Sequence, residues 1–293
     1  MAQRSYAGQR RIHPARCWDT PPSVETSLDA AGTSARATER HHGERSVTTN
    51  TAAPFDTVAA QYDQQWTATP IGRAQREQVW RHVDPLFHPG DRILDVGCGT
   101  GADAAHFAER GVAVHATDPS PSMIEVARRR GSFTAEVLRA EEIATIGKTF
   151  DGALSNFGAL NCVDDLAAVA SGLASVLRPG GRLAICTIGR CCAWEMLYYV
   201  ARGQFAKAFR RFRGSAPSSL GVTVHYPSVG ELRRVFADFE LERWTGIGLL
   251  VPPSYVRMPA RLVRWCSILD CALAPIPPLR AMADHRLLIL VRK

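Results

Sequence analysis

The sequence predicts an α/β fold, in which a mostly parallel sheet carries helices on both faces. Short apolar segments typical of buried strands alternate with helical segments between residues 92 and 187. Parallel strands are joined by right-handed crossovers, and ligands bind beyond their carboxyl ends. A glycine-rich turn and an acidic residue follow the first two strands at these ends. The expected strands are 92–96, 112–117, 134–138, 150–156 and 181–187, and the expected helices between them are 102–110, 121–130 and 164–176.

Two further helices are predicted before the sheet. Apolar residues from Phe55 to Tyr62 are spaced to share one helical face, and a second helix at 74–83 ends before a proline. Residues 1–50 are rich in Ala, Thr, Ser, Arg and Pro and contain almost no bulky aliphatic side chains. Such a segment cannot bury enough apolar surface to offset the entropy lost on ordering, so we expect it to be disordered.

The regular alternation stops at residue 188. A strand returns at 241–244, a further segment covers 246–281, and a final strand is expected at 286–291. The predicted organisation is a disordered extension at 1–50, a core at 51–188, an insertion at 189–240 and a C-terminal part at 241–293.

Two amphipathic segments, 193–213 and 257–273, lie in these additions. Each combines an apolar helical face that carries tryptophan with three or more arginines. One interpretation is an ordinary pair of helices with solvated arginines. The other is an apolar pocket under an electropositive rim, which suits an amphipathic or anionic substrate or docking on a membrane surface.

The turn after the first strand has the sequence Asp95-Val96-Gly97-Cys98-Gly99-Thr100-Gly101. Glycines have no Cβ atom, so a ligand can lie against the main chain while the first amides of the next helix point at it. Asp118 ends the second strand, where a carboxylate can accept hydrogen bonds from both hydroxyls of a ribose. These residues predict a site for a nucleoside-containing cofactor.

The identity of that cofactor depends on Asp95. Gly97, Gly99 and Ala102 also fit the glycine fingerprint of NAD sites, and Asp118 has a suitable spacing. Asp95, however, would lie close to a bound pyrophosphate and would repel it. S-adenosylmethionine has no phosphate, and a carboxylate attracts its sulfonium and ammonium groups. The residues therefore favour S-adenosylmethionine over a dinucleotide.

Four motifs in order resemble those of the class I S-adenosylmethionine-dependent methyltransferases of the small-molecule type. They are the glycine turn, the acidic end of the second strand, and the segments 150–156 and 177–183. The resemblance covers Phe55 to Ile188 and resumes in the last strand. It implies a Rossmann-like, seven-stranded sheet with an antiparallel last strand, and a helical substrate cover built by the insertion after the fifth strand.

The resemblance also implies roles for individual residues. Asp95 would hold the ammonium of S-adenosylmethionine, and Asp118 would hold the ribose hydroxyls. Arg139 stands where many relatives have an acceptor for the adenine amino group, and arginine cannot accept a hydrogen bond, so that contact falls to Ala140 and Glu141. The other expected cofactor contacts are Tyr62 on a lid helix, Gly97, Gly99, Gly101, Pro119, Met123, Ser155 and Asn156.

Methyl transfer is an in-line displacement at a sulfonium, so positioning carries much of its rate. A base is required only for an unactivated hydroxyl, a carbon acid or a protonated amine. The candidate bases are His225 with Tyr226, and His285 before the last strand. We expect transfer to an O, N or C atom of an apolar or amphipathic metabolite or natural product. The alternatives are an RNA or protein methyltransferase and a non-catalytic cofactor-binding regulatory protein.

Composition narrows the classes of protein. The 293 residues are 46% hydrophobic, which is ample for a core, and no run approaches the roughly 20 apolar residues of a membrane-spanning helix. Eight cysteines without a paired framework or a zinc spacing favour a cytoplasmic protein with no metal site. The net charge of +7 and the basic, aromatic stretch at 205–212 suggest nucleic acid as a partner, but the charge forms no dense tail and this interpretation is disfavoured.

Overall fold

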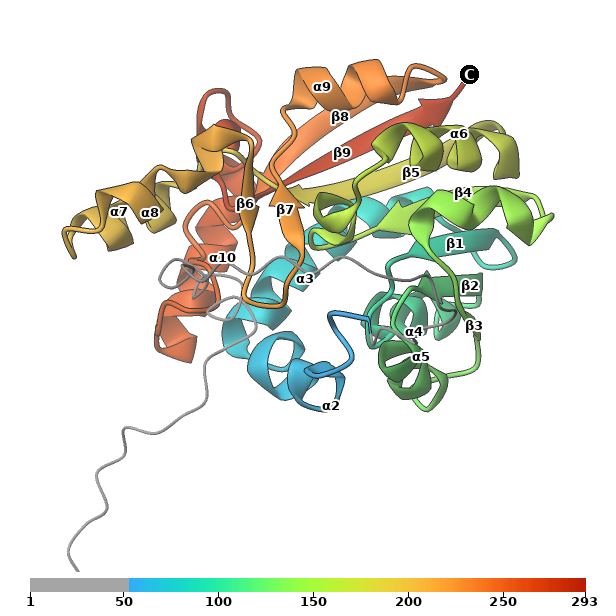
Figure 1. Ribbon diagram of the computed structural model, residues 1–293, viewed down its shortest axis with the longest axis horizontal. Coiled ribbons are helices and arrows are strands. Elements are labelled where there is room, and N and C mark those ends of the chain that lie inside the picture. The colour runs from blue at the N-terminus through green and yellow to red at the C-terminus, as the bar shows by residue number, and fades with distance from the viewer. Residues whose placement is uncertain (1–52) are drawn as a thin grey trace, which may run out of the picture.

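The computed structural model describes residues 53–293, which form a seven-stranded sheet with helices on both faces (Figure 1). The prediction of disorder for residues 1–50 lies outside the described residues. The strands of the sheet are β1 (Arg92–Val96), β2 (Ala113–Asp118), β3 (Thr134–Val137), β4 (Phe150–Ser155), β5 (Leu177–Ile188), β8 (Phe239–Ile247) and β9 (His285–Arg292).

The strand order is β3-β2-β1-β4-β5-β9-β8. Strands β1 to β5 pair in parallel, whereas β9 lies antiparallel between β5 and β8. The predicted Rossmann-like sheet with an antiparallel last strand is therefore confirmed. Because β1 and β4 lie at the centre, the turns after them meet at one edge of the sheet.

The helices are α2 (Ala59–Tyr62), α3 (Pro70–Val83), α4 (Ala102–Ala108), α5 (Pro121–Arg128), α6 (Leu166–Val176), α7 (Ala193–Val200), α8 (Phe205–Ala208), α9 (Val229–Val235) and α10 (Ala260–Leu273). Alternate residues of each strand face opposite sides of the sheet, so the core has two halves. Ile93 packs with residues of α3, α4 and α5, whereas Leu94 packs with residues of α6 and α9.

The N-terminal helices differ from the prediction in their limits. The four-residue α2 continues as a π-helical turn, η1 (Asp63–Thr67), and α3 begins at Pro70 rather than at residue 74. The Thr69 side chain explains this start, because its hydroxyl accepts a hydrogen bond from the Gly72 amide at 3.0 Å and a proline follows it.

Within the insertion, residues 193–213 form three short helical pieces where their pattern suggested continuous helical spacing. Gly203 adopts a left-handed φ of +69° after α7, so α8 and a 3-10 turn, η5 (Arg210–Arg213), follow as separate pieces. The sequence analysis also missed a hairpin of two three-residue strands, β6 (Ser215–Pro217) and β7 (Thr223–His225).

Candidate functional site

A cavity of about 710 Å³ lies at the carboxyl ends of the central strands. This volume is within the usual range for sites that enclose a small ligand. The N-terminal segment around Phe55, the turns after β1, β2 and β4, and the β6–β7 hairpin all contribute to its lining. Ligands of open α/β sheets bind at this edge, so the cavity is the candidate active site.

The glycine turn forms one wall of the cavity. Gly97 and Gly99 line it and have φ values of +70° and +53°. A Cβ on Gly97 would approach the Cβ of Ala159 to 2.3 Å, whereas a Cβ on Gly99 would have no neighbour within 4 Å. Gly99 thus leaves open space for a ligand. Gly101, by contrast, does not line the cavity, and a Cβ there would meet Ala127 at 2.9 Å.

Asp118 lines the cavity at the end of β2. Its Oδ2 accepts a hydrogen bond from the Gly99 amide and its Oδ1 from the Ser120 amide, both at 2.9 Å. A carboxylate has about four acceptor positions, so each oxygen keeps one for a further donor. Burial raises the pKa of Asp118 to about 6, although the two amides oppose this shift. The side chain can therefore accept two ligand hydroxyls while it is ionised.

Asp95 is buried beneath the same wall, and its Oδ2 has no hydrogen-bond partner within the described residues. Burial and the neighbouring Asp103 carboxylate raise its pKa well above the usual range. Asp103 is itself held by Arg76 at 2.5 Å and by the Asn156 amide at 3.1 Å. Because Asp95 has an unused acceptor close to the cavity, it fits a cationic ligand group.

Aromatic and aliphatic side chains line a further part of the cavity, which is called its apolar end below. The rings of Trp66 and Phe157 meet edge to face at 4.6 Å, and Phe157 meets the His285 ring in the same way at 5.3 Å. The Arg76 guanidinium lies 4.8 Å from the centre of the Phe157 ring. The remaining side chains in this part of the lining include Ile188, Val222 and Val224. This end suits an apolar ligand group.

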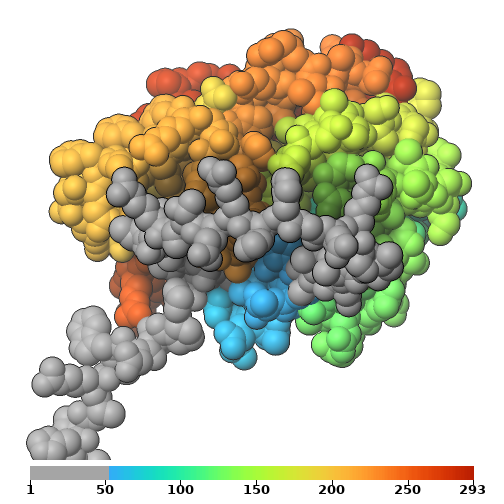
Figure 2. Space-filling view, in the orientation of Figure 1, coloured from blue at the N-terminus to red at the C-terminus, as the bar shows by residue number. Residues whose placement is uncertain are grey.

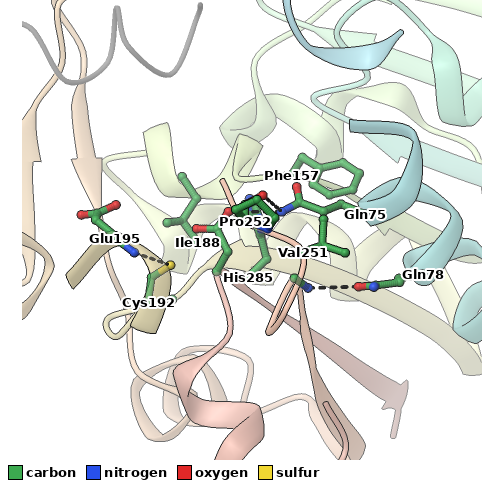
Figure 3. A network of polar contacts seen from close by, with 12 residues as sticks. Gln75, Gln78, Phe157, Ile188, Cys192, Glu195, Val251, Pro252 and His285 are labelled. Carbon is green, nitrogen blue, oxygen red and sulfur yellow. Dashed lines mark hydrogen bonds and ion pairs between the residues drawn. The ribbon is translucent and has the colours of Figure 1, made fainter. Parts of the chain in front are cut away.

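His285 lies at the junction between this apolar end and a buried polar network (Figure 3). Its Nδ1 lies 3.4 Å from the Asp284 carboxylate, which also accepts a hydrogen bond from Arg211 at 2.9 Å. Arg211 in turn pairs with Glu195 at 2.5 Å. Burial lowers the pKa of His285, so the imidazole is neutral near pH 7 and can accept a proton.

The cavity brings together ten of the predicted site residues: Tyr62, Gly97, Gly99, Asp118, Pro119, Met123, Ala140, Glu141, Asn156 and His285. Five others do not line it: Asp95, Gly101, Ser155, His225 and Tyr226. The Ser155 hydroxyl donates to the Val96 carbonyl at 2.9 Å, and the His225 ring lies 3.2 Å from the exposed Asp164 carboxylate. Tyr226 is buried. Among the candidate bases, only His285 therefore faces the cavity.

Trp66 and the β6–β7 hairpin contribute to the cavity but were not predicted. Trp66 lies four residues after Tyr62, so the helical spacing of the two aromatics was the available signal. The hairpin lines the cavity from Gly221 to Val224.

Neither of the amphipathic segments 193–213 and 257–273 contributes a lining residue to the cavity. Arg210 and Arg211 do not form an exposed rim either. Both pair with the buried carboxylate of Glu195, at 3.1 and 2.5 Å. Two buried acids, Glu195 and Asp284, thus balance the charges of these two arginines.

Residues 53–293 contain no group of three or more His, Cys, Asp and Glu side chains arranged to hold a metal ion. No helix in this part of the chain is long and apolar enough to cross a membrane.

Comparisons with known proteins agree with the fold. Residues 93–181 match a family model described as a methyltransferase domain. A demethylmenaquinone methyltransferase from Clavibacter sepedonicus is 37% identical over 141 residues, which cover 46% of this chain and 56% of that protein. A protein of the same name from Thermobifida fusca is 34% identical over 171 residues, which cover 52% of this chain and 71% of that protein.

Solved structures share the fold at low sequence identity. An S-adenosylmethionine-dependent methyltransferase from Thermotoga maritima superposes with a TM-score of 0.56 at 18% identity, over 82% of this chain and 98% of that one. Another from Mesorhizobium loti gives a TM-score of 0.53 at 20% identity, over 76% of this chain and all of that one.

The fold and the site define a Rossmann-like methyltransferase. The chain belongs to the class I S-adenosylmethionine-dependent methyltransferases, a family whose cofactor is S-adenosylmethionine. The chain spans only 56–58% of the length of the first curated relatives that it matches.

Proposed function

We propose that this protein transfers the methyl group of S-adenosylmethionine to an apolar or amphipathic small molecule. One observation carries the proposal: a single cavity joins a wall suited to a nucleoside with an apolar end that contains one neutral histidine. Relatives named demethylmenaquinone methyltransferases support a demethylmenaquinone as the first acceptor to test. The hydroquinone form is the one to supply, because an electron-rich ring is needed to attack an electrophilic methyl group. We also propose that the protein acts in the cytoplasm and contacts a membrane from there.

The residues present fit S-adenosylmethionine. Asp118 would accept hydrogen bonds from the ribose hydroxyls, and Gly99 offers the open space that the nucleoside requires. Asp95 lies behind the lining, so its unpartnered oxygen would attract the ammonium group through water. Pro119, Met123, Ala140 and Glu141 line the part of the cavity that would take the adenine. When bound, the cofactor supplies an electrophilic methyl group on a sulfonium.

The apolar end would hold the acceptor and exclude water. Trp66 and Phe157, packed edge to face, give this part of the lining an apolar character. His285 would take the proton that the acceptor loses as its new bond to carbon forms, and Asp284 beside Nδ1 would stabilise the resulting imidazolium. In this role His285 is the catalytic base, and Asp284 is a positioning residue.

The test is release of S-adenosylhomocysteine with a short-chain demethylmenaquinol as acceptor, at saturating S-adenosylmethionine. We expect turnover by the wild-type protein and a 10²- to 10⁴-fold lower kcat for His285→Asn, the range for a lost general base. His225→Asn is the matched control and should retain wild-type kcat. Cofactor binding without turnover of any small acceptor would contradict the proposal and favour a regulatory protein, and turnover of RNA alone would favour the alternative enzyme class.

A further inference from the structure

The exposed large hydrophobic side chains of this protein gather in one region. Within residues 53–293, all of them except Val137 lie between residues 197 and 282. Those on α7, α8, η5 and α10 are Leu197, Val200, Phe205, Phe209, Phe212, Leu262, Trp265, Ile268 and Leu269. Trp265 is 66% exposed and Leu197 67% exposed, values that are unusual for such large side chains.

These side chains do not serve the cavity or the core. Helix α10 packs on α3 through a separate face, which contains Val263 and Asp270, and Asp270 accepts a hydrogen bond from Gln78 of α3 at 2.9 Å. Trp265 and Leu269 lie on the side of α10 that is left exposed. The apolar stripe therefore has no partner among the described residues.

The two parts of this surface are fixed at the same end of the molecule (Figures 1 and 2). The Trp194 indole donates to the Leu250 carbonyl at 3.0 Å, and the Tyr255 hydroxyl donates to Glu195 at 3.1 Å. These contacts join α7 to the segment that leads into α10. The exposed residues of α7, α8, η5 and α10 are called the apolar end surface below.

The charge on this surface has a single sign. Between residues 196 and 230 the sequence contains no acid, and between 243 and 293 its only acids are the buried Asp270 and Asp284. Exposed cations do occur there: Arg202, Arg213, Arg257, Arg261 and Arg264. Arg213, Arg261 and Arg264 form no ion pair within residues 53–293.

We propose that the apolar end surface docks on an anionic lipid membrane. Tryptophan and aliphatic side chains interleaved with arginines are the pattern by which helices lie in the lipid interface, because the apolar groups enter the acyl boundary while the cations meet lipid phosphates. A symmetric contact with a second copy would place like charges together. Nucleic acid would leave the aliphatic side chains without a partner.

Vesicle co-sedimentation of the full chain tests this proposal. We expect binding to phosphatidylglycerol–phosphatidylcholine vesicles that weakens as salt rises, and much weaker binding to pure phosphatidylcholine. Arg261→Gln with Arg264→Gln should lower the partition coefficient about 25-fold, at about fivefold per arginine. Trp265→Gln should lower it at least about tenfold.

Arg233→Gln with Arg234→Gln is the matched control, because these arginines are exposed on α9, outside the apolar end surface. It should bind as the wild type does. All variants keep residues 1–52, so a loss confined to the α10 variants assigns the contact to α10. Equal binding by all variants, or no binding at low salt, would overturn the proposal. A dimer dissociated by Trp265→Gln without vesicle binding, or tight RNA binding instead, would also overturn it. The assay needs neither cofactor nor acceptor, so its outcome is independent of the proposed methyl transfer.

Discussion

Substituting Asp118 with asparagine should weaken cofactor binding by a calculable amount. Each carboxylate oxygen already accepts one backbone amide at 2.9 Å, from Gly99 and Ser120, and keeps one acceptor position for a ribose hydroxyl. Asparagine keeps one oxygen, and its NH₂ group would face one of those amides as a second donor. The variant should therefore lose at least one hydrogen bond to a charged acceptor, worth about 1.5–3 kcal/mol, or about 10- to 150-fold in Kd.

Calorimetric titration with S-adenosylhomocysteine measures this loss. A 2′,3′-dideoxy analogue of the same ligand provides the second arm of a double-mutant cycle. It should bind the wild type more weakly than the parent ligand does, and Asp118→Asn should reduce its affinity little further. The melting temperature of the free variant reports whether the turn still folds. If the variant lost the same free energy with both ligands, Asp118 would not contact the ribose and our placement of the nucleoside would be refuted.

Three other outcomes follow from the site and its supports. Burial raises the pKa of Asp118 to about 6, and only its ionised form accepts two hydroxyls. The Kd of the wild type for S-adenosylhomocysteine should therefore rise as the pH falls from 7.5 to 5, whereas the Kd of Asp118→Asn should stay constant. A constant wild-type Kd over this pH range would contradict the assignment. Glu195→Gln leaves Arg210 and the buried Arg211 with Asp284 as the one remaining acid of this network, so it should lower the free energy of unfolding in urea by about 3–5 kcal/mol. An unchanged midpoint would mean that the Glu195 charge contributes nothing to stability. Gly99→Ala should mainly weaken cofactor binding. Gly101→Ala should mainly lower the melting temperature, because its new Cβ would lie 2.9 Å from the Cβ of Ala127. The reverse pattern would show that the roles of these two glycines had been misassigned.

The core of the fold was predictable because its signals are local. The strand that ends at Val96 is a short, mainly apolar segment between Asp91 and Gly97, so its limits matched the prediction. Helix α5 also began where Pro121 and the preceding Ser120 predicted, since the Ser120 hydroxyl accepts a hydrogen bond from the Met123 amide at 3.1 Å. Gly97 and Gly99, which follow this strand, and Met123 in the first turn of α5 then line the cavity as expected.

Interactions between distant segments could not be predicted in the same way. The arginines of η5 have no acid nearby in sequence, and only the folded chain shows that Arg210 and Arg211 pair with the buried acids Glu195 and Asp284. The β6–β7 hairpin has strands too short for an alternating pattern to emerge. Its position over the cavity depends instead on contacts such as that of Asn161, whose amide donates to the His225 carbonyl at 2.5 Å.

The central claim is that one cavity holds the nucleoside at Asp118 and directs the reacting centre toward His285. A crystal structure with bound S-adenosylhomocysteine tests it most directly. We predict ribose hydroxyls within about 3.2 Å of the Asp118 carboxylate oxygens, and a ligand sulfur that points into the space enclosed by Trp66, Phe157 and His285. A nucleoside bound elsewhere, or a sulfur directed away from that space, would contradict the account.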